Sequence, residues 1–206
     1  MTAAIDYRAK KLAPELLPLL TLQDGGHDKR TDGLCVMEAA AWLAGEPHSA
    51  TPSCASPLVT RFAQRINDRF DQTTRDALRD RLPLIVGSRS TSDVERKRSL
   101  EFVYLFATLN FARALEFLAG VERVAKYRDR LLAGAATLRA LKRDDEPNKW
   151  RADAQQARAT VQEVRREFPA YAYAYAILDA SRRAEFKAQR AKDALAILDA
   201  ILAIRE

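Results

Sequence analysis

Apolar residues recur at helical spacing along most of the chain, and polar stretches rich in glycine and proline interrupt them. One such run lies between about residues 58 and 70, where the apolar positions are Leu58, Phe62, Ile66 and Phe70. A four-residue step places these side chains on one face of a helix. Ser56 and Pro57 precede the run as a capping serine and a first-turn proline. The pattern as a whole predicts an all-α protein with a helical core.

A second run, from about Val94 to Ala119, is apolar on most of its sides. Such a helix is typical of the buried centre of a bundle. Ser92 and Glu95 have the spacing of a capping box and are expected to begin it. After Gly120 we expect a further helix to about Lys142. Its apolar stripe consists of Val124, Leu131, Ala135 and Leu138.

The last part of the chain has the pattern of an antiparallel helical hairpin. Apolar and small residues follow alternating steps of four and three from Trp150 to Phe168, and the pattern returns from Ile177 to Leu202. Pro169 marks the expected turn. The small residues let two helices approach closely, either within one chain or between two chains of a homodimer.

The stretch from Asp24 to Pro57 differs from the helices around it. It contains both histidines and both cysteines of the chain and four of its seven glycines. Its middle predicts a helix from about Leu34 to Ala44, with Asp32 as the N-cap and Gly45 as the residue that ends it. Two polar loops flank this helix, so we expect a loop-rich Cys/His module.

The module contains the only thiol and imidazole groups of the chain. They are His27, Cys35, His48 and Cys54. Two cysteines and two histidines are a common ligand set for zinc. Their spacing matches no standard zinc finger or ribbon, and free cysteines are often simply buried apolar residues. A zinc-stabilised module is therefore one interpretation, and a metal-free core is the other.

Cys35 also has a catalytic interpretation. The expected helix would place its thiol in the first turn, where the helix dipole lowers the pKa of a thiol. His27 or His48 would then act as the base, oriented by Glu38 or Glu46. This arrangement would make the chain a cysteine-dependent or metal-dependent hydrolase, with Cys35 as nucleophile or ligand.

A basic segment with several hydroxyl side chains joins two of the expected helices. Its cationic residues are Arg81, Arg89, Arg96, Lys97 and Arg98. Loop hydroxyls and free N–H groups ahead of a helix N-terminus suit phosphate, so this segment is a candidate binding site. Asp93 and Glu95 lie among the cations and weaken their field, which favours an exposed, capped loop instead.

The overall composition limits the class of protein. The chain has 206 residues, 48% hydrophobic and 30% charged, and no apolar run of about 18 residues that would predict a membrane span. Two cysteines without a recognisable secretion signal favour a reducing, cytoplasmic setting. The net charge of +6 permits an acidic partner such as nucleic acid, although the two signs are mixed along the sequence.

Three short motifs in the module resemble a known family. They are DGLCVME at Asp32–Glu38, LAGE at Leu43–Glu46 and PSCASP at Pro52–Pro57. In these motifs the chain is similar to uncharacterised proteins of actinobacteria and their phages, and the similarity extends to about Ala119. The resemblance implies a phage or prophage accessory protein and carries over no catalytic residues. It also implies an aromatic residue at the position of His48 in similar sequences, which would leave Glu38 or Glu46 as the replacement ligand.

These observations predict two parts of the chain. Residues 1–120 form a helical core with the Cys/His module, and residues 121–206 form a helical arm that ends in the hairpin. We expect a non-enzymatic role in which the arm binds a macromolecule of host or phage, with a protein partner favoured and nucleic acid open. Tyr171, Tyr173 and Tyr175 favour a protein, because tyrosine is enriched at interfaces.

Overall fold

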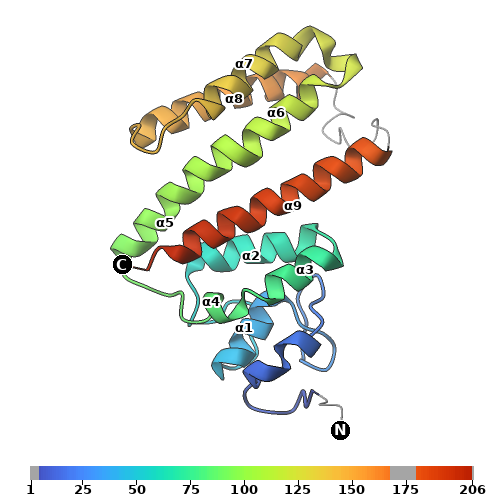
Figure 1. Cartoon of the computed structure of the whole chain (residues 1–206), viewed down its shortest axis with the longest axis vertical. Helices are drawn as coiled ribbons and strands as arrows, with labels where there is room; N and C mark the ends of the chain where they lie inside the picture. The colour runs from blue at the N-terminus through green and yellow to red at the C-terminus, as the bar shows by residue number, and fades with distance from the viewer. Residues whose placement is uncertain (1–4, 168–179, 206) are drawn as a thin grey trace. The chain divides into compact units, whose positions relative to one another are not determined.

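The structure, a computed structural model, describes residues 5–167 and 180–205. These residues are helical or lie in turns and loops, and none of them forms a strand, so the all-α prediction is confirmed (Figure 1). The chain divides into two compact units, residues 1–99 with 198–206, and residues 100–197. The sequence had indicated a boundary at about 120 instead.

The first unit contains a short 3-10 helix and four α-helices, together with the start of α5 and the end of α9. The elements are η1 (Pro14–Leu19), α1 (Val36–Ala44), α2 (Pro57–Arg69), α3 (Gln72–Arg79), α4 (Leu82–Ile85), α5 (Ser92–Leu105) and α9 (Ala180–Ala203). Helix α1 lies at the centre, packed against α2, α3 and α4. Each of its residues from Val36 to Leu43 is buried, and all of them except Glu38 are apolar.

The ends of these helices agree with the sequence at some positions and differ at others. Ser56 Oγ accepts the backbone N–H of Val59 at 3.5 Å, and Gly45 ends α1 with a φ of 80° in the left-handed region, as expected. Asp32, however, is not the cap of α1. Cys35 is the N-cap, so its thiol precedes the first turn and does not lie inside it.

The predicted capping box at the start of α5 is wrong. Ser92 is the first helical residue, and Thr91 Oγ1 accepts the backbone N–H of Val94 at 3.4 Å. Glu95 is therefore free to bond elsewhere, and it accepts Ser56 Oγ–H at 2.5 Å. This bond ties the start of α2 to the first turn of α5.

The second unit is a small bundle whose core is made by α6, α7 and α8. The elements are the end of α5, η2 (Phe106–Phe111), α6 (Ala112–Ala119), η3 (Glu122–Tyr127), α7 (Arg128–Arg139), α8 (Pro147–Glu167) and most of α9. The stripe of Val124, Leu131, Ala135 and Leu138 is buried in this core, as its spacing predicted. Gly134 of α7 faces Ala157 of α8, and a Cβ added at Gly134 would lie 3.5 Å from Ala157 Cβ, an ordinary van der Waals contact.

The long apolar run from Val94 to Ala119 is not one regular helix. The segment η2 has π-helical hydrogen bonding, which places Thr108 and Asn110 inside the unit. Arg190 of α9 donates to Asn110 Oδ1 at 3.2 Å. Ser92–Ala119 is long and apolar enough to span a membrane by length and composition, and 33% of its most apolar window is buried. The expectation of no membrane span stays a prediction.

The predicted pairing of the last two helices is not confirmed. Helix α8 packs against α7, and its Trp150, Ala157 and Val164 belong to the core of the second unit. Helix α9 contacts α6, where Phe186 stacks on Phe117 with 3.8 Å between ring centroids. The expected turn at Pro169 and the three tyrosines Tyr171, Tyr173 and Tyr175 lie outside the described residues.

Candidate functional site

The Cys/His module is organised around one buried carboxylate, that of Glu38, which is 2% exposed. Glu38 lies in the first turn of α1, and its Oε2 accepts the backbone N–H of Cys35 at 2.8 Å. In return, the Cys35 side chain accepts the backbone N–H of Glu38. The two residues thus form a capping box in which a cysteine stands where serine or threonine is usual.

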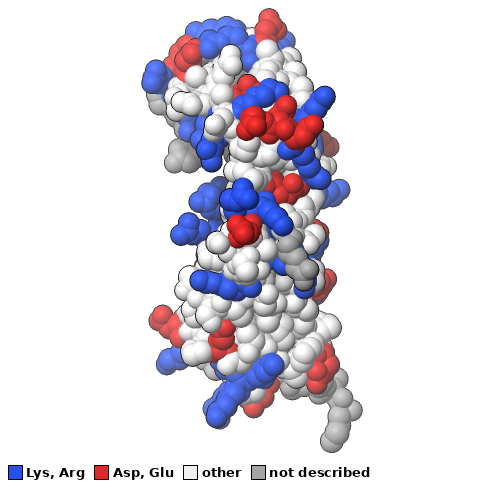
Figure 2. Space-filling view, turned by 90° about the vertical axis from the view of Figure 1, so that its left-hand side faces the viewer, with Lys and Arg blue, Asp and Glu red and all other residues white. Residues whose placement is uncertain are grey.

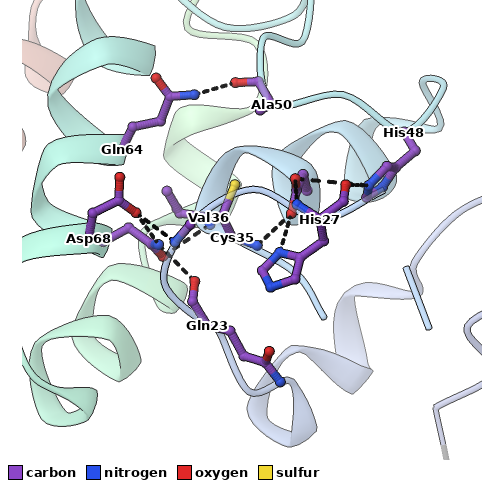
Figure 3. Close-up of polar contacts among 11 residues, drawn as sticks. Gln23, His27, Cys35, Val36, His48, Ala50, Gln64 and Asp68 are labelled. Atoms are coloured by element: carbon purple, nitrogen blue, oxygen red, sulfur yellow. Dashed lines mark hydrogen bonds and ion pairs between the residues drawn. The ribbon is translucent and has the colours of Figure 1, made fainter. Parts of the chain in front are cut away.

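The same carboxylate holds the loop before α1. Glu38 Oε1 accepts the backbone N–H of His27 at 2.8 Å, and Glu38 Oε2 lies 2.9 Å from His27 Nδ1 (Figure 3). Burial raises the pKa of Glu38, but the hydrogen bonds from the N–H groups of Cys35 and His27 outweigh it, so the net shift is downward. Glu38 is therefore ionised at neutral pH.

The second histidine links the two loops of the module. His48 Nε2 donates to the carbonyl oxygen of His27 at 2.7 Å and lies 3.9 Å from Glu38 Oε1. Its Nδ1 is buried and has no hydrogen-bond partner among the described residues. His27, His48 and Glu38 thus come together, as a histidine oriented by a glutamate requires.

A buried amide on α2 completes the network. Asn67 Oδ1 accepts the backbone N–H of Val36 at 3.2 Å, and Asn67 Nδ2 donates to the carbonyl oxygen of Gln23 at 2.8 Å. The neighbouring Asp68 accepts the backbone N–H of Gly25 at 3.1 Å. These bonds fix the loop from Gln23 to His27 against the start of α1 and against α2 (Figure 3).

The two cysteines have the properties of buried thiols. Both are free, and Cys35 is 3% exposed while Cys54 is partly buried. Burial raises the pKa of Cys35 to about 12, and burial also raises the pKa of Cys54, which lies beside Glu46. Cys35 is thus protonated at neutral pH, whereas a nucleophilic cysteine needs a depressed pKa.

The predicted zinc ligands are brought only partly together. Among the described residues no group of three or more histidine, cysteine, aspartate or glutamate side chains is placed to hold a metal ion. His27 Nδ1 and His48 Nε2 lie at hydrogen-bonding distance from protein oxygens, and Cys35 accepts an N–H. These hydrogen bonds tie the loops together as zinc was expected to, and the zinc site stays a prediction.

The predicted basic site separates into structural and surface residues. Arg98 is 2% exposed and donates to the carbonyl oxygens of Ser88, Ile201 and Ile204, which closes the end of α9. Arg81 makes a two-pronged ion pair with Asp199, with N–O distances of 2.6 and 2.7 Å. Arg96 and Lys97 are exposed on α5, and the backbone N–H of Arg89 donates to the carbonyl oxygen of Cys54 at 3.1 Å.

Two series of exposed arginines were not predicted from the sequence. On α8, the exposed side chains opposite its packed face are Arg151, Gln155, Arg158, Gln162 and Arg165, which we name the α8 stripe. On α2, Arg61, Arg65 and Arg69 are exposed one helical turn apart. Their spacing was visible in the sequence. Their exposure could be recognised only once the packed faces of α2 and α8 were known.

The charge on the rest of the surface is mixed. Figure 2 shows lysine and arginine interspersed with aspartate and glutamate on the face that it presents. This distribution agrees with the alternating signs along the sequence, so any electrostatic site must be sought in single elements.

Comparisons of the chain with protein-family models, with curated proteins and with solved structures found no match. The resemblance to actinobacterial and phage proteins therefore stays a prediction, and function rests on the geometry alone.

Proposed function

We propose that this protein is a non-enzymatic binding protein that contacts nucleic acid through the α8 stripe. The observation that carries the proposal is the set of unpaired cations along this stripe. Arg151, Arg158 and Arg165 are exposed, and no described residue forms an ion pair or a hydrogen bond with any of them. Most of the exposed arginines on α7, by contrast, are paired, as Arg130 is with Glu163 and Arg139 with Glu116.

The stripe has the geometry of a backbone-contacting helix face. Residues 151 to 165 span about 21 Å at 1.5 Å per residue, which is about two-thirds of a turn of duplex DNA. Guanidinium groups donate two parallel hydrogen bonds to a phosphate, and glutamine side chains also bond to phosphate oxygens. No acidic side chain stands among the five residues of the stripe.

In this proposal the Cys/His module has a structural role and not a catalytic one. Its carboxylate and imidazole groups are joined to one another, and burial keeps the Cys35 thiol protonated. Zinc bound by His27, Cys35, His48 and Cys54 would need these hydrogen bonds to rearrange. Elemental mass spectrometry of protein purified without chelator tests whether zinc is bound. About one zinc per chain would support a zinc-stabilised module.

The test of nucleic-acid binding compares two variants of equal charge. In the first, Arg151, Arg158 and Arg165 are replaced by glutamine, and in the second the ion-paired Arg130, Arg139 and Arg143 are replaced in the same way. Fluorescence anisotropy with labelled duplex DNA and single-stranded RNA measures affinity at fixed salt. The α8 variant is expected to bind about 10- to 100-fold more weakly, and the variant of the ion-paired arginines to change much less.

Equal losses in both variants, or no binding by the unaltered protein to either nucleic acid, would overturn the proposal.

A protein partner is the second candidate, because Val103 is 37% exposed next to the stacked pair Phe102 and Phe106. A second copy of this chain is also a candidate partner, through the region of α8 and α9. Analytical ultracentrifugation over a range of concentrations tests for that homodimer. The proposed role as a phage accessory protein rests only on the resemblance of the three sequence motifs.

A further inference from the structure

A cavity of about 440 Å³ lies between the Cys/His module and α2. Its lining consists of Gly25, Gly26, Cys35, Ala50, Arg61, Gln64, Arg65 and Asp68. Its volume is in the range of small-molecule sites, and four of its eight lining residues carry polar side chains. Figure 3 shows Gln64, Asp68, Ala50 and Cys35 around this space.

Two of the lining residues carry positive charges that have no bonding partner among the described residues. Arg61 and Arg65 are one helical turn apart on α2, both are exposed, and no described residue bonds to either guanidinium group. The single carboxylate in the lining is that of Asp68, whose Oδ1 already accepts the backbone N–H of Gly25 and the side-chain N–H of Asn67. The cavity is therefore cationic on balance.

The remaining wall is fixed in place by the module. Gln64 Nε2 donates to the carbonyl oxygen of Ala50 at 2.7 Å, which holds the loop after α1 against α2. Gly25 has a φ of 78° and open space around its Cβ position, so the loop backbone can lie along the cavity without a side chain filling it. The network of Glu38 and Asn67 thus builds a preformed cavity.

We infer that this cavity binds a small anionic molecule through a phosphate or carboxylate group held between Arg61 and Arg65. Guanidinium groups match both of these anions, and each makes two parallel hydrogen bonds to them. The oxygens of Gln64 and Asp68 accept hydrogen bonds from hydroxyl or amino groups on the same ligand. The volume admits a ligand larger than the bare anion. This inference does not rest on the α8 stripe, because none of its residues belongs to that helix.

The experiment is an NMR titration at constant ionic strength with inorganic phosphate, succinate and adenosine monophosphate as probes. The expected result is a saturable shift of the backbone amide signals of Gly25, Gly26 and Cys35. Arg61→Gln and Arg65→Gln should each weaken binding by about tenfold or more, the loss expected for one charge-assisted hydrogen bond. Arg69→Gln is the matched control, since Arg69 lies one turn further along α2 and does not line the cavity.

Saturation by the phosphate-bearing probes alone assigns a phosphoryl ligand, and saturation by succinate alone assigns a carboxylate ligand. No saturable shift with any probe overturns the inference, and so does an equal loss of affinity in Arg69→Gln. The triple glutamine variant of the α8 stripe should leave the titration unchanged. Failure of nucleic-acid binding and failure of this site are therefore separate results.

Discussion

Glu38 is the residue on which the module depends most. Three N–H groups from two segments of the chain converge on its buried carboxylate. Hydrogen bonds to charged groups are worth more than neutral ones, and removing one partner from a buried network leaves the other groups unsatisfied. The position of His27 within its loop therefore depends strongly on this one side chain.

Replacing Glu38 with glutamine is expected to lower the free energy of unfolding by about 2–4 kcal/mol. The amide keeps the volume but loses the charge, and its NH2 group faces N–H donors. Urea unfolding followed by circular dichroism measures the change. Glu46→Gln is the control, because Glu46 lies nearer the surface and accepts only from Ser53 and Cys54, and it should cost less than about 1 kcal/mol. Equal losses would contradict this account.

The lowered pKa of Glu38 also predicts the direction in which the free energy of unfolding changes with pH. Because the folded-state pKa lies below the unfolded value of about 4.3, the contribution of Glu38 is present above that pH. It is lost as the pH falls through the folded-state pKa. Glu38→Gln should therefore flatten the acid limb of the stability curve, measured as unfolding free energy against pH.

Burial of the Cys35 side chain is expected to make its thiol unreactive. In a Cys54→Ser background, iodoacetamide at pH 7 should alkylate Cys35 on the order of a thousandfold more slowly than an unhindered cysteine, because its pKa is about 12. Mass spectrometry over time measures the rate, and urea should restore it. Rapid alkylation of the folded protein would favour the hydrolase interpretation instead.

Among the elements, α9 ends in an arrangement that the sequence did not reveal. Arg98 was predicted to bind a ligand, yet its guanidinium group bonds to the carbonyl oxygens at the end of α9. Those carbonyls have no partner within the helix itself. The sequence could not show this role, because residues about a hundred positions apart meet only in the fold.

Arg98→Gln is expected to lower the free energy of unfolding by about 2–4 kcal/mol, since it leaves buried carbonyl groups unsatisfied. Hydrogen exchange of the last turn of α9 should increase in parallel. Arg96→Gln, two positions away and exposed, should stay within about 0.5 kcal/mol of the unaltered protein. If the two variants behave alike, Arg98 does not close the helix.

The sequence predicted elements better than it predicted their ends and partners. Periodicity located α2 and the buried stripe of α7, because a regular apolar face is a local property. It missed the π-helical turn at Phe106–Phe111, in which Asn110 is buried and accepts a hydrogen bond from Arg190, 80 positions away. Within the site, it named Glu38 or Glu46 as the residue that orients a histidine, and the geometry places Glu38 beside His27. The cavity beside Arg61 and Arg65 was beyond its reach, since it forms between segments far apart in the chain.

At the scale of the whole molecule, the structural module and the α8 stripe use different residues. The module fixes its own loops and one wall of a cationic cavity, while the α8 stripe presents unpaired arginines on another helix. With a net charge of +6 and mixed signs elsewhere, local arrangement and not total charge would decide what binds.

The salt dependence of nucleic-acid binding tests the central claim most directly. Each phosphate contact contributes a slope of about −0.9 to a plot of log affinity against log salt for duplex DNA. Replacing Arg151, Arg158 and Arg165 with glutamine should flatten that slope by about 2–3, whereas the equally charged replacement of the ion-paired Arg130, Arg139 and Arg143 should leave it nearly unchanged. Equal slopes for the unaltered protein and the α8 variant would contradict the account.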